Sequence, residues 1–311
     1  MKYLYICFIA MAISVKSFAQ GCSDAGFCSL GSLKNHLTDD DSATTVKKNQ
    51  SIAFGINYGL GEQKTSTVNG YIEYQAKFNN RFAFQSKITG TYATGFLGNT
   101  FNPDDVYTTL NYSPQVSKVN SLNFIGGIKV PLTYGNAKNA EGKPLPLDYQ
   151  ASIGTYDAIG GVNYIVNRKW EFDAAVQVPV IQVNKSTYFP DEYSDPRALK
   201  FAPTNNFRRK SDLLARIGYY IYLPQSSITL KPSISGIYHV GNDTYENRFG
   251  DKTFIDGSRG LTLNGSIVAT KRFKNANQFE IVVGTPFIVR KERPDGLTRS
   301  GVINFQYTIA F

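Results

Sequence analysis

Residues 301–311, GVINFQYTIAF, decide the fold class. Every second position of this stretch is apolar, namely Ile303, Phe305, Tyr307, Ile309 and Phe311. Amide, hydroxyl and small side chains stand between them, which is the period-two pattern of a β-strand with one apolar face. An open aromatic strand of this kind invites aggregation. In a closed barrel it instead pairs with the first strand and turns its apolar face to lipid.

The same alternation repeats from residue 50 onward and gives twelve segments. In SIAFGINYGL, for example, the apolar set is Ile52, Phe54, Ile56, Tyr58 and Leu60. The charged residues of these segments all fall on the opposite parity, and a charge on the lipid face costs about 2–4 kcal/mol at the midplane. A soluble β-sandwich alternates too, but it would place charges on its outer faces. We therefore expect residues 50–311 to form an all-β domain, a transmembrane antiparallel up-and-down β-barrel of about 12 strands.

The connections between these segments also alternate in length. Short turns are expected near residues 79–81, 114–120, 167–169, 223–227 and 271–277. Longer loops are expected near 95–104, 135–149, 182–208, 241–257 and 288–300, with a brief one at 61–65. Short turns on the periplasmic side and long loops on the outside are typical of outer-membrane barrels. An even strand number places Phe311 on the periplasmic side, at the interface between the outer membrane and water, where it would act as an anchor.

The N-terminus reads as an export signal. Lys2 precedes the apolar run YLYICFIAMAI, and Ser17 and Ala19 supply small residues for cleavage, so residues 1–19 are expected to be a signal peptide. No later apolar run reaches about 18 residues, the length that a membrane-crossing helix needs. The expected location is the cell outer membrane.

Residues 20–49 are small, polar and aperiodic, and we expect them to form a periplasmic extension or a plug in the barrel. The close, even pair Cys22 and Cys28 predicts a disulfide in an exported chain. Metal binding would need more ligands, and the nearest is His36. No metal site and no cofactor are predicted.

Charged and titratable residues on the inward parity are the candidate functional set. These lumen-facing candidates are Glu73, Lys77, Lys87, Asp105, Lys129, Asp157, Glu171, Asp173, Asp212, Arg216, Lys231, His239 and Glu280. One interpretation is a wall of charges that neutralise one another, since buried charges need partners. The other is a solute path whose selectivity they set. Twelve strands enclose more room than eight, so a narrow channel is geometrically possible.

Two further features suggest partners or chemistry. His239 lies near Ser235 and Asp243 in the sequence, which raises a hydrolase as an alternative, although no nucleophile elbow or nucleotide loop occurs. The basic stretches FRRK (207–210) and RKERPDGLTR (290–299) fall in outer loops, where contact with anionic lipid headgroups is expected. Expected partners are outer-membrane lipid and lipopolysaccharide, a small-molecule solute and envelope proteins, but no nucleic acid.

The runs FIGGIKVPLTYG and LDYQASIGTYDAIGGVNYIVNRKWEFDAAVQ carry a family resemblance. They resemble a family of outer-membrane barrels assigned as transporters of the meta-pathway of phenol degradation. The matching positions are Gly127, Lys129, Pro131, Gly154, Thr155, Asp157, Trp170 and Gln177. The resemblance covers about residues 121–180 and 279–311, and GCSDAGFC lies outside it. It implies an outer-membrane transport role without naming a solute.

These features predict a non-enzymatic outer-membrane barrel. Its expected function is that of a passive channel or transporter for a small solute, with hydrophobic or aromatic solutes among the options. The alternative is a non-transporting barrel that anchors or scaffolds an envelope protein complex. An outer-membrane hydrolase is the third option.

Overall fold

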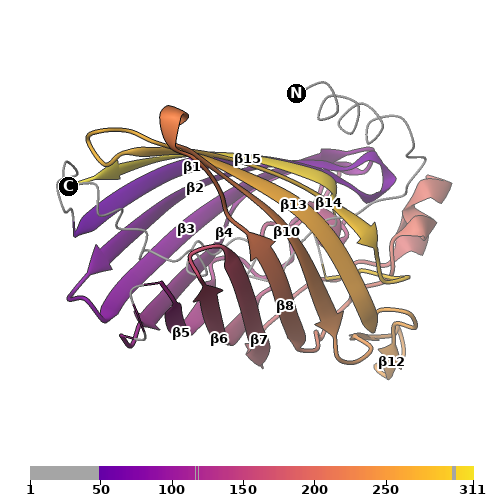
Figure 1. Cartoon of the computed structure of the whole chain (residues 1–311). Coiled ribbons are helices and arrows are strands. Elements are labelled where there is room, and N and C mark those ends of the chain that lie inside the picture. Colours follow the sequence, from indigo (N-terminus) through magenta and orange to yellow (C-terminus); the bar gives the residue numbers. More distant parts are fainter. Residues whose placement is uncertain (1–48, 116, 118, 296–298) are drawn as a thin grey trace.

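A closed ring of antiparallel strands forms the body of the molecule (Figure 1). The structure is a computed structural model that describes residues 49–115, 117, 119–295 and 299–311. Within these residues the strand order is β13-β14-β15-β1-β2-β3-β4-β5-β6-β7-β8-β10-β9, and β13 also pairs with β10. Because β8 and β9 are two parts of one wall strand that both pair with β10, the wall has twelve strands. The predicted twelve-strand barrel is confirmed.

The wall strands are mostly 11 to 15 residues long. Their bounds are β1 Gln50–Gly61, β2 Ser66–Lys77, β3 Phe82–Gly95, β4 Gly98–Tyr112, β5 Ser121–Pro131, β6 Thr155–Val166, β7 Trp170–Gln182, β8 Asp212–Tyr219, β9 Ile221–Leu223, β10 Ile228–His239, β13 Gly260–Arg272, β14 Gln278–Ile288 and β15 Arg299–Ala310. Strands of this length, when tilted, can span a bilayer.

The first and last strands close the barrel. Phe54 stands opposite Tyr307 and Ile56 opposite Phe305 in the β1–β15 ladder. The backbones of Gln50 and Phe311 exchange two hydrogen bonds, with N···O distances of 3.2 and 2.9 Å. Because β15 also pairs with β14, residues 301–311 have no free edge.

The Tyr71 side chain connects three strands where the barrel closes. The ring of Tyr71, on β2, lies across Gly55 of β1, and its hydroxyl donates to Asn304 Oδ1 at 3.1 Å and is 2.9 Å from Gln306 Oε1 on β15. A Cβ atom added at Gly55 would lie only 2.1 Å from Tyr71 Cζ. Gly55 is thus required by the close approach of an aromatic ring.

Gly55→Ala is expected to displace the Tyr71 ring and to lower the free energy of unfolding by about 1–3 kcal/mol, a typical cost of overpacking. Unfolding in detergent, followed by heat-modifiable gel migration, measures the change. Gly70→Ala is the matched control, because a Cβ at Gly70, on the adjacent strand, meets no atom within 4 Å. Equal stability of the two variants would show that the Tyr71 bridge contributes nothing to closure.

The outer wall is an apolar surface. Phe54 and Ile56 are 48% and 52% exposed, and outward aliphatic and aromatic side chains continue around the ring. Lys271, near the short-turn end of β13, departs from the expected absence of outward charge; its Nζ donates to the Ser226 carbonyl. None of the described residues belongs to a helix long and apolar enough to cross a membrane.

The prediction of a long loop near residues 95–104 is wrong. β3 continues to Gly95 and β4 begins at Gly98, so a tight hairpin joins them. The register shifts between Ile88 and Gly90, opposite Pro103, and beyond this irregularity Phe101 is 75% exposed. The irregularity reverses the inward and outward parity along β4, so the period-two pattern predicts only the second half of the strand.

The other long connections fold over one end of the barrel, here called the long-loop end. Residues 132–154, 183–211 and 240–259 form a cap that includes the hairpin of β11 (Thr244–Glu246) and β12 (Lys252–Phe254). In its first apolar cluster, Leu145, Tyr149, Tyr188, Ala198 and Phe201 pack with Leu97 of the β3–β4 hairpin, and its second cluster holds Leu147, Ile153, Phe207 and Ile255. The cap therefore has a buried core of its own. The predicted signal peptide, the N-terminal extension and the Cys22–Cys28 disulfide lie outside the described residues.

Candidate functional site

The inward-facing charges gather mainly in two clusters, one at each end of the barrel. The long-loop cluster contains Asp105, Lys129, Asp157, Arg209, Asp212, His239, Asp243, Arg290 and Asp295. The short-turn cluster contains Glu171, Asp173, Arg216 and Lys231. Most of these side chains are buried, so each charge depends on its partners.

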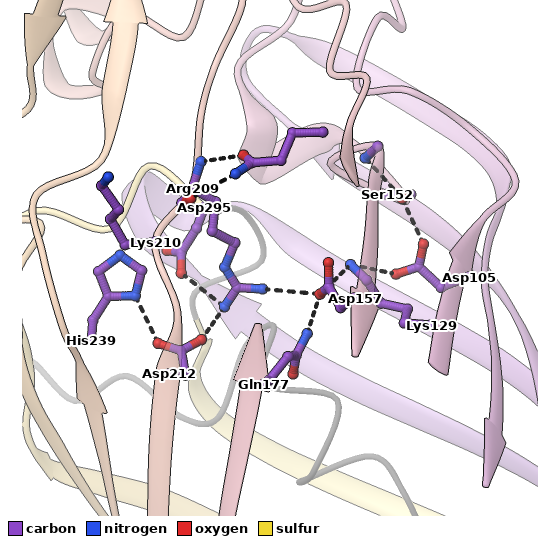
Figure 2. Close-up of polar contacts among 12 residues, drawn as sticks. Asp105, Lys129, Ser152, Asp157, Gln177, Arg209, Lys210, Asp212, His239 and Asp295 are labelled. Carbon is purple, nitrogen blue, oxygen red and sulfur yellow. Dashed lines mark hydrogen bonds and ion pairs between the residues drawn. The ribbon is translucent and has the colours of Figure 1, made fainter. Parts of the chain in front are cut away.

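Lys129 lies at the centre of one half of the long-loop cluster. It is fully buried, with its Nζ 3.4 Å from Asp105 Oδ2 and 3.3 Å from Asp157 Oδ2 (Figure 2). Ser152, from the cap, donates to Asp105 Oδ1 at 2.6 Å, and the Gln177 amide donates to Asp157. Strands β4, β5 and β6 are thereby joined to each other and to the cap.

Arg209 connects this half to the rest of the long-loop cluster. Its guanidinium pairs with Asp212 and lies 3.9 Å from Asp157 and 3.7 Å from Asp295 (Figure 2). The residue belongs to FRRK, for which lipid contact was expected, and for Arg209 that expectation is wrong because its side chain is buried in the barrel mouth. Arg208 and Lys210, on either side, are exposed.

His239 is held between two carboxylates. Its Nδ1 lies 2.7 Å from Asp212 Oδ1 and its Nε2 lies 2.8 Å from Asp243 Oδ1. Since both partners accept hydrogen bonds when ionised, the arrangement suits a doubly protonated imidazolium. Asp243 belongs to the cap and His239 to the wall, so this contact fixes the β10–β13 loop to the barrel.

Arg290 fixes the remaining connection, between β14 and β15. Its Nη2 donates to both carboxylate oxygens of Asp295, at 2.7 and 2.6 Å, and its Nη1 donates to the Ser258 carbonyl at 2.7 Å. Burial works to raise the pKa of Asp295, but the nearby cations Arg290 and Arg209 hold it well below its usual range. Arg290 is the second basic residue that points inward although lipid contact was expected for its stretch.

Asp148 is a buried acid within the cap. It lies in the short turn η3 (Leu147–Tyr149), whose two flanking side chains belong to different apolar clusters. Burial raises the pKa of Asp148 to about 8, and the charge of Asp295 adds to the effect. The carboxyl is therefore mainly protonated at neutral pH when the cap is packed.

This shift makes cap packing sensitive to pH. The packed cap holds a proton that an opened cap releases above the ordinary carboxyl pKa of 3.8. The stabilisation of the packed cap is complete below about pH 4 and is lost progressively as the pH rises toward 8.

Cleavage of the cap by added protease should therefore accelerate between pH 5 and pH 8, and Asp148→Asn should remove most of that acceleration. Asp191→Asn, an exposed acid of the same cap, is the control and should keep the wild-type profile; an unchanged profile in Asp148→Asn would contradict the assignment.

The short-turn cluster is a continuous chain of ion pairs. Lys231 Nζ lies 3.1 and 3.0 Å from the two carboxylate oxygens of Glu171. Arg216 contacts Glu171 at 3.3 Å and Asp173 at 2.6 Å, and Asn163 donates to Asp173 at 2.7 Å. Four of the predicted lumen residues are thus brought together on β7, β8 and β10.

Four predicted residues lie outside both clusters. Glu73 stands opposite Lys87 on β2 and β3, and Lys87 Nζ lies 3.8 Å from the centre of the Tyr71 ring. Glu280 accepts a hydrogen bond from Thr270 at 3.3 Å, and Lys77 is half-buried at the short-turn end of β2. Among the described residues, no group of three His, Cys, Asp or Glu side chains is placed to hold a metal ion.

An apolar band occupies the inner wall between the charged clusters. It consists of Tyr107, Ile125, Ile159, Leu214 and Ile237, with Ala175 packed against them. These residues were not among the sequence candidates, which were chosen for charge. Their signal was available, because each is an apolar side chain on the inward parity of a strand. From β4 to β10 the inner wall therefore carries the apolar band between the two charged clusters.

A closed β-ring with an apolar outer wall and a polar interior defines the class of membrane β-barrels, since an open edge cannot cross lipid. No protein-family model and no curated protein matches the chain. Among solved structures, it is similar to the COG4313 outer membrane channel from Pseudomonas putida F1, at 12% identity over 88% of this chain and 99% of that one, with a TM-score of 0.58.

Two other similarities are weaker. The translocator domain of the autotransporter NalP from Neisseria meningitidis matches at 9% identity, over 93% of this chain and 95% of that one, with a TM-score of 0.48. Outer membrane phospholipase A from Escherichia coli matches at 8% identity, over 90% and 96%, with a TM-score of 0.36. Of these three similarities, only that to the channel supports an inference, and the inference concerns the fold. Membership of the phenol meta-pathway family stays a prediction.

Proposed function

We propose that this protein is an outer-membrane channel through which a small solute passes passively. The observation that carries the proposal is the layered lumen, in which an apolar band lies between two charged clusters inside a wall whose outer surface is apolar. Residues that only filled a soluble barrel would not need an apolar exterior. A fold similar to that of a protein described as an outer membrane channel agrees with this function.

The layers also suggest which solutes suit the channel. Charged clusters at both ends select by electrostatics, and the apolar band favours solutes with an aliphatic or aromatic part. The phenol meta-pathway resemblance agrees with an aromatic solute. We expect outer-membrane lipid and lipopolysaccharide to surround the wall, and the exposed side chains of Arg208 and Lys210 to contact headgroup phosphates.

The contacts of His239 argue against a hydrolase. In a catalytic triad one ring nitrogen must face the nucleophile. Here both nitrogens are held by carboxylates, Asp212 and Asp243. Ser235, the serine considered from the sequence, stands opposite Arg216 and Asn264 in the strand ladders. We therefore propose that no reaction is catalysed.

Reconstitution tests the channel function. Liposomes that contain the full-length mature protein should swell in small neutral solutes, and planar bilayers should show discrete conductance steps. Empty liposomes, and liposomes with heat-denatured protein, are the controls. A sealed barrel that copurifies with stoichiometric envelope proteins would contradict the channel and favour the scaffold alternative.

A further inference from the structure

Two neighbouring rows of inward side chains cross β3, β4, β5 and β6 between the charged clusters. In the first row Gln85 stands opposite Thr109, Thr109 opposite Gly127, and Gly127 opposite Ile159. In the second row Asn111 stands opposite Ile125, which belongs to the apolar band. Because directly opposite residues have their Cβ atoms about 4.5–5.5 Å apart, these side chains form one patch on the lumen wall.

The polar members of this patch have unused hydrogen-bonding groups. Gln85 and Asn111 are 1% and 3% exposed, and for both side chains the amide nitrogen and the amide oxygen lack a hydrogen-bond partner within the described part of the chain. The Thr109 hydroxyl is also buried and also lacks a hydrogen-bond partner within these residues. Buried polar groups normally have partners, and leaving them without one costs free energy. Two amides and a hydroxyl in adjacent positions therefore offer both donors and acceptors to a bound molecule.

Gly127 allows Thr109 to pack closely against β5, beside the apolar band. A Cβ at Gly127 would lie 2.6 Å from both the Thr108 carbonyl oxygen and Thr109 Cγ2. Glycine at such a strand position is typical where another group approaches the backbone closely. The absence of a side chain at position 127 lets the Thr109 methyl group pack against the β5 backbone, in the same row as Ile159.

The charges nearest to the patch are already engaged. Lys87, two residues from Gln85, lies over the Tyr71 ring. Lys129, two residues from Gly127, lies between Asp105 and Asp157. The patch itself is uncharged, with amide and hydroxyl groups on β3 and β4 and aliphatic groups on β5 and β6.

We propose that Gln85, Thr109 and Asn111, with Ile125 and Ile159, form a solute subsite of the channel. Its ligand class is a neutral molecule with hydroxyl or carbonyl groups on one side and an apolar or aromatic group on the other. A charged solute would not find a counter-ion there. The subsite rests on the proposed channel function and gives its solute a chemical class.

Calorimetry on the purified full-length mature protein in detergent tests the subsite, because it does not depend on conductance. The probes are phenyl β-D-glucoside, which has both parts, glucose, which lacks the apolar part, and phenyl β-D-glucuronide, which adds a charge. We expect phenyl glucoside to bind at least tenfold more tightly than the other two. The double variant Gln85→Leu/Asn111→Leu should lose at least tenfold in affinity for it.

The control variant is Ser86→Ala/Thr108→Ala, on the same two strands but on the outer face, where the two hydroxyls are 3.2 Å apart. It should bind phenyl glucoside as the wild type does. Heat-modifiable migration checks folding, and the double leucine variant should be at least as stable as the wild type, since it removes unsatisfied polar groups. Equal affinity for the three probes, or unchanged affinity in the leucine variant, would overturn the subsite. Conductance in potassium chloride is measured separately, so loss of the channel function is recognised independently.

Discussion

Lys129→Met should destabilise the barrel by about 3–5 kcal/mol, the usual cost of leaving buried charges without their partner. Methionine has a similar volume and removes only the ammonium group between Asp105 and Asp157. The two carboxylates then face each other in a buried site, while Arg209 lies 3.9 Å from one of them. Urea unfolding in detergent measures the loss, and the cap should become easier to cleave with protease because Ser152 of the cap bonds to Asp105.

A triple variant separates charge from packing. Lys129→Met/Asp105→Asn/Asp157→Asn removes all three charges and should recover most of the lost stability, since an uncharged site of similar volume is often as stable as a buried ion pair. Arg197→Met is the matched control for an exposed pair: Arg197 and Asp195 are both solvent-accessible, and the variant should unfold as the wild type does. If Lys129→Met were as stable as the wild type, the long-loop cluster would not hold the barrel mouth together.

Ile56→Arg should cost about 2–4 kcal/mol in a lipid bilayer, because it places a charge on the outer wall near the membrane midplane. Ile56 is half-exposed in the middle of β1 and stands between Phe305 and Gly70 on the neighbouring strands. Folding into phospholipid vesicles as a function of urea measures the cost. The same substitution at Phe249, an exposed apolar residue of the cap hairpin, should have little effect. Equal costs at the two positions would mean that no lipid surrounds β1.

The sequence predicted the barrel because one physical constraint acts on every strand. Lipid outside and polar contacts inside make apolar and polar side chains alternate along each wall segment, so strands such as β1 and β15 can be recognised individually from the sequence. The pattern fails where the backbone departs from regular pairing. At Gly90 and Pro103 the irregular register reverses the parity, so the predicted strand is shorter than β4.

The charged site was only partly predictable. Inward parity marked Lys129, Asp212 and His239, which lie on regular strands. The sequence did not show which of them meet, because that depends on register and on loops. Arg209 and Arg290 lie in loops, where no periodicity constrains the side-chain direction, and only the folded cap shows that they turn inward.

The apolar band and the subsite were missed for a different reason. Selection by charge passed over Ile125 and Ile159, which stand on the inward parity like their charged neighbours. Gln85 and Asn111 resemble any polar lumen residue in sequence. Their distinguishing property is the lack of a hydrogen-bond partner within the described residues, and it becomes visible only in three dimensions.

The central claim is that lipid meets the outside of the barrel wall. Nitroxide labels placed one at a time at Phe54, Ile56 and Tyr58 of β1, and at Phe249 of the exposed cap hairpin, in cysteine-free protein reconstituted in vesicles, test it most directly. Labels at the three wall positions should collide more often with oxygen than with a water-soluble nickel chelate, whereas the label at Phe249 should collide more often with the chelate. Equal access of the nickel chelate to the wall positions and to Phe249 would contradict the account.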